Sequence, residues 1–171
     1  MIVRIWISLF ALLLGVNLGL AQEMAPPAEL KKLDWYLGEW SGKFNFTMPD
    51  MQGEAAFSFK NEMDGNFIRT TSVMEFSGMK MTETTFLGWN DKVKKYEQYT
   101  FTNIANTPRI ERADPGDAKW VFLSEPWNAG GAEVVSRATL TKKSATEMEI
   151  LLEFKEGDKW SKVGSGSFKK K

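Results

Sequence analysis

Apolar and polar residues alternate at every second position over many short segments of this chain. From Trp40 onward, Trp40, Phe44 and Met48 fall on one face of the segment, and polar residues occupy the other face. The same alternation recurs over residues 55–59 and around Ile150. A period of two is typical of β-strands with one buried face, so the pattern predicts a sheet whose strands each present one apolar side.

About ten such segments follow one another between residues 40 and 169, at spacings of about 8–12 residues that are typical of an all-β barrel or sandwich. We expect an antiparallel barrel of about ten strands, because closure removes exposed strand edges and can enclose a small ligand. A sandwich would instead fill its centre with interlocked side chains. Residues 125–131 are rich in Pro, Asn and Gly and are expected to form a surface loop.

One helical segment precedes the strands. Over residues 28–37, Leu30, Leu33 and Leu37 lie on one helical stripe, with a proline before the segment and a glycine after it. We expect this short helix to plug one end of the barrel. Trp40 should then lie inside the barrel beside Leu33 and Leu37.

Residues 1–21 have the features of a secretory signal peptide. A single positive charge at Arg4 precedes an apolar run, and the small residues Gly19 and Ala21 suit cleavage after Ala21. The run is shorter than the roughly 20 residues that a membrane span needs, so an uncleaved anchor is only the alternative. We expect one mature domain, residues 22–171, that is periplasmic or secreted and has no stable membrane anchor.

The chain contains neither His nor Cys. This excludes a Ser-His-Asp triad, a cysteine nucleophile, lipidation or disulfides through cysteine, and nearly every ordinary transition-metal site. The 22 Lys and Arg balance the 22 Asp and Glu, so the charge does not select nucleic acid as a partner. We expect no cofactor, no metal and no nucleic-acid partner, and the oligomeric state stays open.

Two methionine pairs are the remaining candidates for a soft metal. Met48 and Met51 form one pair, and Met79 and Met81 form the other. Thioethers can hold Cu(I), but a site made of thioethers alone would be weak, and methionine commonly fills cores. We therefore rank copper binding below binding of an organic ligand.

Four motifs are spread through residues 28–169: Leu37-Gly-Glu-Trp-Ser-Gly42, Met63-Asp-Gly-Asn-Phe-Ile-Arg69, Leu87-Gly-Trp-Asn-Asp91 followed by Lys95-Tyr96, and Arg137-Ala-Thr-Leu-Thr141. Together they resemble an uncharacterised bacterial branch of the calycins, the superfamily of lipocalins and fatty-acid-binding proteins. The resemblance implies a calycin-like barrel but no particular activity. A related branch binds haem through a lumenal histidine, and the lack of His excludes that route here.

Aromatic side chains are the main candidates for a ligand-binding lining. They make up 13% of the chain. At period two they ordinarily form a packed interior, and barrel closure decides between packing and a cavity. The residues that we expect to line a cavity are Trp40, Phe44, Phe57, Tyr99 and Trp120.

Two arginines within predicted strands are candidate anchors for an acidic ligand. Arg69 and Arg137 would be costly inside the barrel unless a carboxylate, such as Glu75 or Glu83, or an acidic ligand paired with them. An inward arginine is expected close to Tyr96 or Tyr99. The alternative is an outward arginine in a surface ion pair.

These observations predict a non-catalytic binding protein for a small apolar or amphipathic molecule in the barrel lumen, with no catalytic residue assigned. One alternative is a hydrolase or isomerase that uses lumenal carboxylates. Another is an interaction module of the cell envelope with a filled lumen. Inward acidic pairs would favour the enzyme, an empty apolar lumen the binding protein, and an exposed apolar loop around Trp127 the interaction module.

Overall fold

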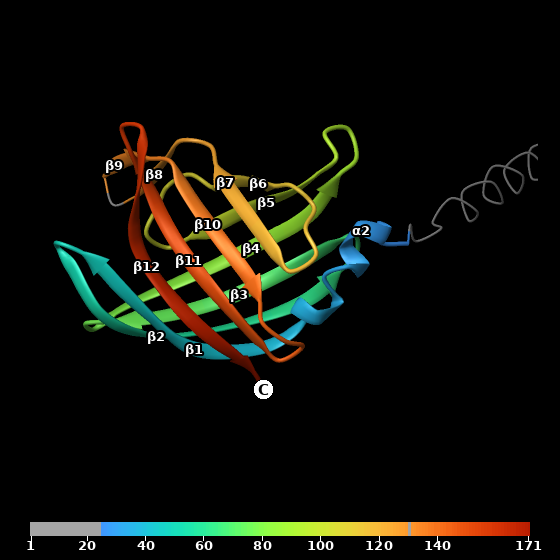
Figure 1. Ribbon diagram of the computed structural model, residues 1–171, viewed down its shortest axis with the longest axis horizontal. Coiled ribbons are helices and arrows are strands. Elements are labelled where there is room, and N and C mark those ends of the chain that lie inside the picture. The colour runs from blue at the N-terminus through green and yellow to red at the C-terminus, as the bar shows by residue number, and fades with distance from the viewer. Residues whose placement is uncertain (1–24, 130) are drawn as a thin grey trace, which may run out of the picture.

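Ten strands form a closed barrel in the computed structural model, which describes residues 25–129 and 131–171. Around the barrel the order is β1-β12-β11-β10-β7-β6-β5-β4-β3-β2, and β8 pairs only with β9 (Figure 1). Neighbouring strands are antiparallel throughout. The predicted all-β antiparallel barrel of about ten strands is therefore confirmed, whereas the predicted signal peptide, residues 1–21, lies outside the described residues.

The helical elements come first and the strands follow in a meander. Their bounds are α2 (Ala28–Lys31), η1 (Asp34–Tyr36), β1 (Gly38–Met48), β2 (Met51–Asp64), β3 (Phe67–Phe76), β4 (Met79–Asn90), β5 (Lys95–Thr102), β6 (Arg109–Ala113), β7 (Lys119–Ser124), β8 (Trp127–Ala129), β9 (Ala132–Val134), β10 (Ser136–Lys142), β11 (Glu147–Glu156) and β12 (Lys159–Lys170).

The apolar faces predicted for β1 and β2 lie inside the barrel. Trp40 pairs with Phe59 and Phe44 pairs with Ala55, and all four residues are buried. Residues that pair directly across two strands lie on the same face of the sheet, so the two alternating patterns join into one apolar wall.

Glycines allow the barrel to close between β1 and β12. Gly164 pairs with Phe46, and a Cβ atom added to Gly164 would lie 2.5 Å from the backbone oxygen of Asn45 and 2.5 Å from the Phe44 ring. Such distances are too short for any side chain, so a glycine is required where the two strands approach this closely.

The segment of α2 and η1 lies across one end of the barrel, which we call the closed end (Figure 1). Leu30 and Leu33 are buried there. The single predicted helix over residues 28–37 is instead two short pieces, because the chain bends at Leu33. A straight helix would present one apolar stripe, whereas the bend also packs Trp35 and Tyr36 against the core. Within the described residues no helix has the length and apolarity that a membrane span needs.

The opposite end carries the β1–β2 hairpin and the β8–β9 hairpin (Figure 1). The prediction of a surface loop over residues 125–131 is wrong in part, since Trp127–Ala129 forms β8 and pairs with β9. Trp127 is only 9% exposed, and its indole Nε1 donates a hydrogen bond to Ser136 Oγ at 3.1 Å. The loop-forming residues make a hairpin turn, in which Gly131 N donates to Asn128 Oδ1 at 2.8 Å.

Candidate ligand-binding cavity

A cavity of about 400 Å³ lies inside the barrel. This volume falls within the range of about 300–1,000 Å³ that small-molecule sites occupy. Much of its wall is apolar, and this part includes Phe44, Phe57, Phe122 and the four methionines Met48, Met51, Met74 and Met81. Unbranched thioether side chains adapt easily to the shape of a ligand.

The polar part of the lining comes from β3 to β6. Its hydroxyl groups come from Thr70, Ser72, Thr85, Thr100 and Thr102, and its charged or amide groups come from Glu83, Gln98, Arg109 and Glu111. The cavity is therefore amphipathic: β3 to β6 contribute its polar groups together with apolar ones such as Met74 and Met81, and the side chains from the other strands are apolar.

Arg109 and Glu111 project from β6 into this cavity and meet side chains of β4 and β5. Arg109 Nε donates to Glu111 Oε2 at 3.0 Å, and Gln98 Nε2 donates to the same oxygen at 2.6 Å. Arg109 Nη1 lies 3.6 Å from Glu83 Oε1. Its guanidinium also lies over the Trp127 ring, 4.9 Å from the centroid, so β8 helps to hold the arginine in place.

Burial and the neighbouring charges shift the pKa values of Glu83 and Arg109 in this cluster. Burial raises the pKa of Glu83, and Arg109 only partly opposes this effect. Burial alone would lower the pKa of Arg109, but the charges of Glu111 and Glu83 outweigh it, so the pKa is raised and the guanidinium stays protonated. The site thus combines a permanent cation with a carboxyl group that burial makes harder to ionise.

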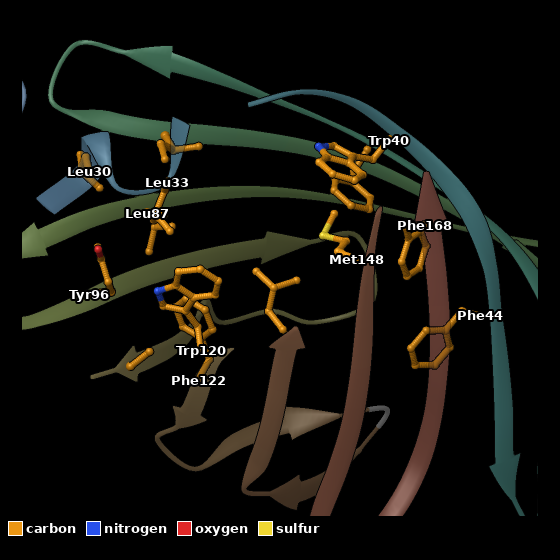
Figure 2. Close-up of a cluster of buried hydrophobic side chains, with 14 of the residues drawn as sticks. Leu30, Leu33, Trp40, Phe44, Leu87, Tyr96, Trp120, Phe122, Met148 and Phe168 are labelled. Atoms are coloured by element: carbon orange, nitrogen blue, oxygen red, sulfur yellow. The ribbon is translucent and has the colours of Figure 1, made fainter. Parts of the chain in front are cut away.

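Two of the expected lining residues, Phe44 and Phe57, do line the cavity. Trp40 and Trp120 are buried, but they pack at the closed end and are not part of the cavity lining (Figure 2). Trp40 Nε1 donates to the backbone oxygen of Tyr36 at 2.9 Å. Trp120 stacks on Trp35 with 5.3 Å between ring centroids. These two tryptophans therefore pack against the helical segment of the closed end and do not face the cavity.

The two expected tyrosines are not brought together in the lumen. Tyr96 is buried at the closed end, where its hydroxyl donates to the backbone oxygen of Glu29 at 2.8 Å. Tyr99 points outward, is 40% exposed and donates to Glu97. The reason is their spacing, because residues three positions apart on a strand face opposite sides.

Arg69 and Arg137 lie on the outer face of the barrel, which corrects their assignment as candidate lumenal anchors. Arg69 pairs with Glu62 and Asp64. Arg137 forms a two-point ion pair with Glu153, with Nε to Oε2 at 2.7 Å. In both strands the neighbouring residues Thr70 and Ala138 line the cavity, so the arginines must point to the other side.

Sequence reasoning missed Arg109 and Glu111 and considered Glu83 only as a partner for another arginine. In β6 the apolar residue between Arg109 and Glu111 is Ile110, so alternation alone suggests that the isoleucine faces inward. Ile110 pairs with the outward Tyr99, which places the two charged residues inside. Only the pairing of β6 with β5 shows which face of β6 points inward, and the alternation of residues in the sequence does not reveal that pairing.

No family model and no curated protein matches the chain. Among solved structures, the crystal structure of Rv2717c from M. tuberculosis is similar, with a TM-score of 0.70 and 15% sequence identity. The match covers 86% of this chain and 99% of that chain. At this level of identity the similarity concerns the fold and not the activity. The chain therefore shares its closed β-barrel fold with Rv2717c.

Proposed function

We propose that this protein is an exported, calycin-like and non-catalytic binding protein that holds a small apolar or amphipathic molecule in its barrel. The observation that carries the proposal is the amphipathic cavity of about 400 Å³. An interior whose side chains only stabilised the fold would be close-packed, with few voids larger than a water molecule. The lining contains both apolar and polar side chains, which favours an amphipathic ligand over a purely apolar one.

Fluorescence titration with the uncharged dye Nile red tests this proposal. We expect saturable binding that Ala138→Phe abolishes, because Ala138 lines the cavity and a larger side chain there occupies the ligand's space. Val121→Phe is the matched control, since Val121 lies on the outer face of the neighbouring strand β7 and is exposed. Equal binding by both variants would place the dye outside the lumen and contradict the proposal.

Native mass spectrometry of the protein purified from its own host complements the titration. A co-purifying small molecule that is absent from the Ala138→Phe variant would identify the natural ligand. The same preparation tests export, because a cleaved signal peptide predicts a mature chain that begins at Gln22. A chain that retains residues 1–21 in the cell envelope would contradict that part of the proposal.

A hydrolase or isomerase is the second candidate function. The inward carboxyl groups of Glu83 and Glu111 favour it, and burial raises the pKa of Glu83 toward the range in which a general acid operates. Turnover of nitrophenyl esters or glycosides that is lost in Glu83→Gln would favour this candidate. Saturable binding without turnover favours the binding protein.

A further inference from the structure

Three charged side chains lie among the described residues that line the cavity: Glu83, Arg109 and Glu111. One guanidinium thus meets two carboxylates, and the cluster carries one surplus negative charge when both carboxylates are ionised. An uncompensated charge in a partly desolvated cavity is unfavourable, so a ligand that supplies one positive charge would relieve it.

Arg109 is poorly placed to bind an acidic ligand. Its Nε already donates to Glu111 at 3.0 Å, its Nη1 lies near Glu83, and its face rests on Trp127. An anionic head group would therefore meet a guanidinium whose charge is balanced, and it would add a third negative charge to the cluster. Coulomb repulsion in this partly desolvated site opposes such a ligand.

Glu111 is also fully engaged, whereas Glu83 is not. Glu111 is 1% exposed and accepts hydrogen bonds from both Gln98 and Arg109. The distance of 3.6 Å from Glu83 Oε1 to Arg109 Nη1 is an ion pair but too long for a hydrogen bond. The Glu83 side chain remains 15% exposed, and because it lines the cavity, this exposed part faces the ligand space.

We infer that the ligand is an amphipath whose polar end is a protonated amine, bound by the Glu83 carboxylate, with its apolar part against the phenylalanine and methionine wall. This inference rests on the proposed binding function and names its ligand class. An ammonium group offers three donors and no acceptor, which matches a carboxylate with free lone pairs. Charge-assisted hydrogen bonds of this type are roughly twice as strong as neutral ones.

Competition against Nile red with three ligands of equal chain length tests the inference at neutral pH: decylamine, decanol and decanoate. A hydrogen bond to a charged group predicts that decylamine binds about ten- to a hundredfold more tightly than decanol. Decanoate should bind more weakly than decanol, because it adds a negative charge to the cluster.

The variant Glu83→Gln keeps the size of the side chain and removes its charge. It should weaken decylamine binding by about ten- to a hundredfold and leave decanol binding within about threefold. Glu75→Gln is the matched control, because Glu75 is an exposed carboxylate on the neighbouring strand β3, and it should change neither affinity.

The outcomes separate the inference from the function on which it rests. If decanoate displaces the dye better than decylamine, or if Glu83→Gln leaves decylamine binding unchanged, the amine assignment is wrong while the binding function stands. If Nile red and all three ligands fail to bind the wild type, the binding function itself is refuted.

Discussion

Replacement of Arg109 by methionine tests whether the lumenal charge cluster is held together by its one cation. Arg109→Met keeps an unbranched side chain of similar length but leaves Glu111, which is 1% exposed, with Gln98 as its remaining hydrogen-bond donor. Removal of one partner from a buried ion pair costs about 3–5 kcal/mol. Loss of the contact with the Trp127 ring adds about 0.5–2 kcal/mol.

Because Arg109 retains some exposure to the cavity, with a side chain 19% exposed, we expect a total loss near the lower end of these two ranges, about 3.5 kcal/mol. Urea unfolding at neutral pH, followed by tryptophan fluorescence, measures it. Arg69→Met is the control, since Arg69 pairs on the outer surface and a surface ion pair contributes about 0–1 kcal/mol. The double variant Arg109→Met, Glu111→Gln should recover part of the loss, because it removes the unpaired carboxylate.

The loss in Arg109→Met should also shrink as the pH falls. Burial already raises the pKa of Glu83 in the folded wild type, and removal of the guanidinium raises it further. A carboxyl group with a raised pKa in the folded state stabilises the fold below its unfolded pKa, and this contribution is lost as the pH rises through the folded pKa. A loss for Arg109→Met that equals the loss for Arg69→Met at every pH would refute the proposed role of Arg109.

The remaining predictions concern Glu83, the closed end and the strand closure. Glu83→Gln should increase the free energy of unfolding at neutral pH, because it removes a carboxylate whose charged form is disfavoured by burial. This gain in stability should vanish in acid, where the carboxyl group of the wild type is protonated. Urea melts that show no gain at neutral pH would contradict this prediction. Trp40→Ala should cost about 3–5 kcal/mol, since Trp40 is 0% exposed. Trp160→Ala should cost far less, because Trp160 is only partly buried and its ring packs against the outward Arg137. If Trp40→Ala hardly changes the free energy of unfolding, the interpretation that the helical segment plugs this end of the barrel is wrong. Gly164→Ala should lower the melting temperature, because its Cβ would lie 2.5 Å from Asn45 O; an unchanged melting temperature would show that the two strands can separate there without cost.

The sequence by itself determined the fold class and several strand faces. In β1, β2 and β11 one face is mostly apolar and the other mostly polar, so the hydrophobic effect favours only the orientation with the apolar face inside the barrel. This is why Phe44 and Phe57 could be placed in the lumen in advance. Leu30 and Leu33 were likewise recognisable as the buried stripe of the plug.

Tertiary structure alone decided the polar part of the lining. In β5 and β6 both faces carry apolar and polar residues, so alternation defines two faces but not which one points inward. Closure of the barrel settles this, because the register with neighbouring strands places Gln98 and Glu111 inside and leaves Tyr99 outside. A shift of one residue would exchange these faces, and the energy of that choice depends on partners distant in sequence, such as Glu83 on β4. The arginine that faces the cavity is therefore Arg109, because pairing between strands determines the inward face of β6.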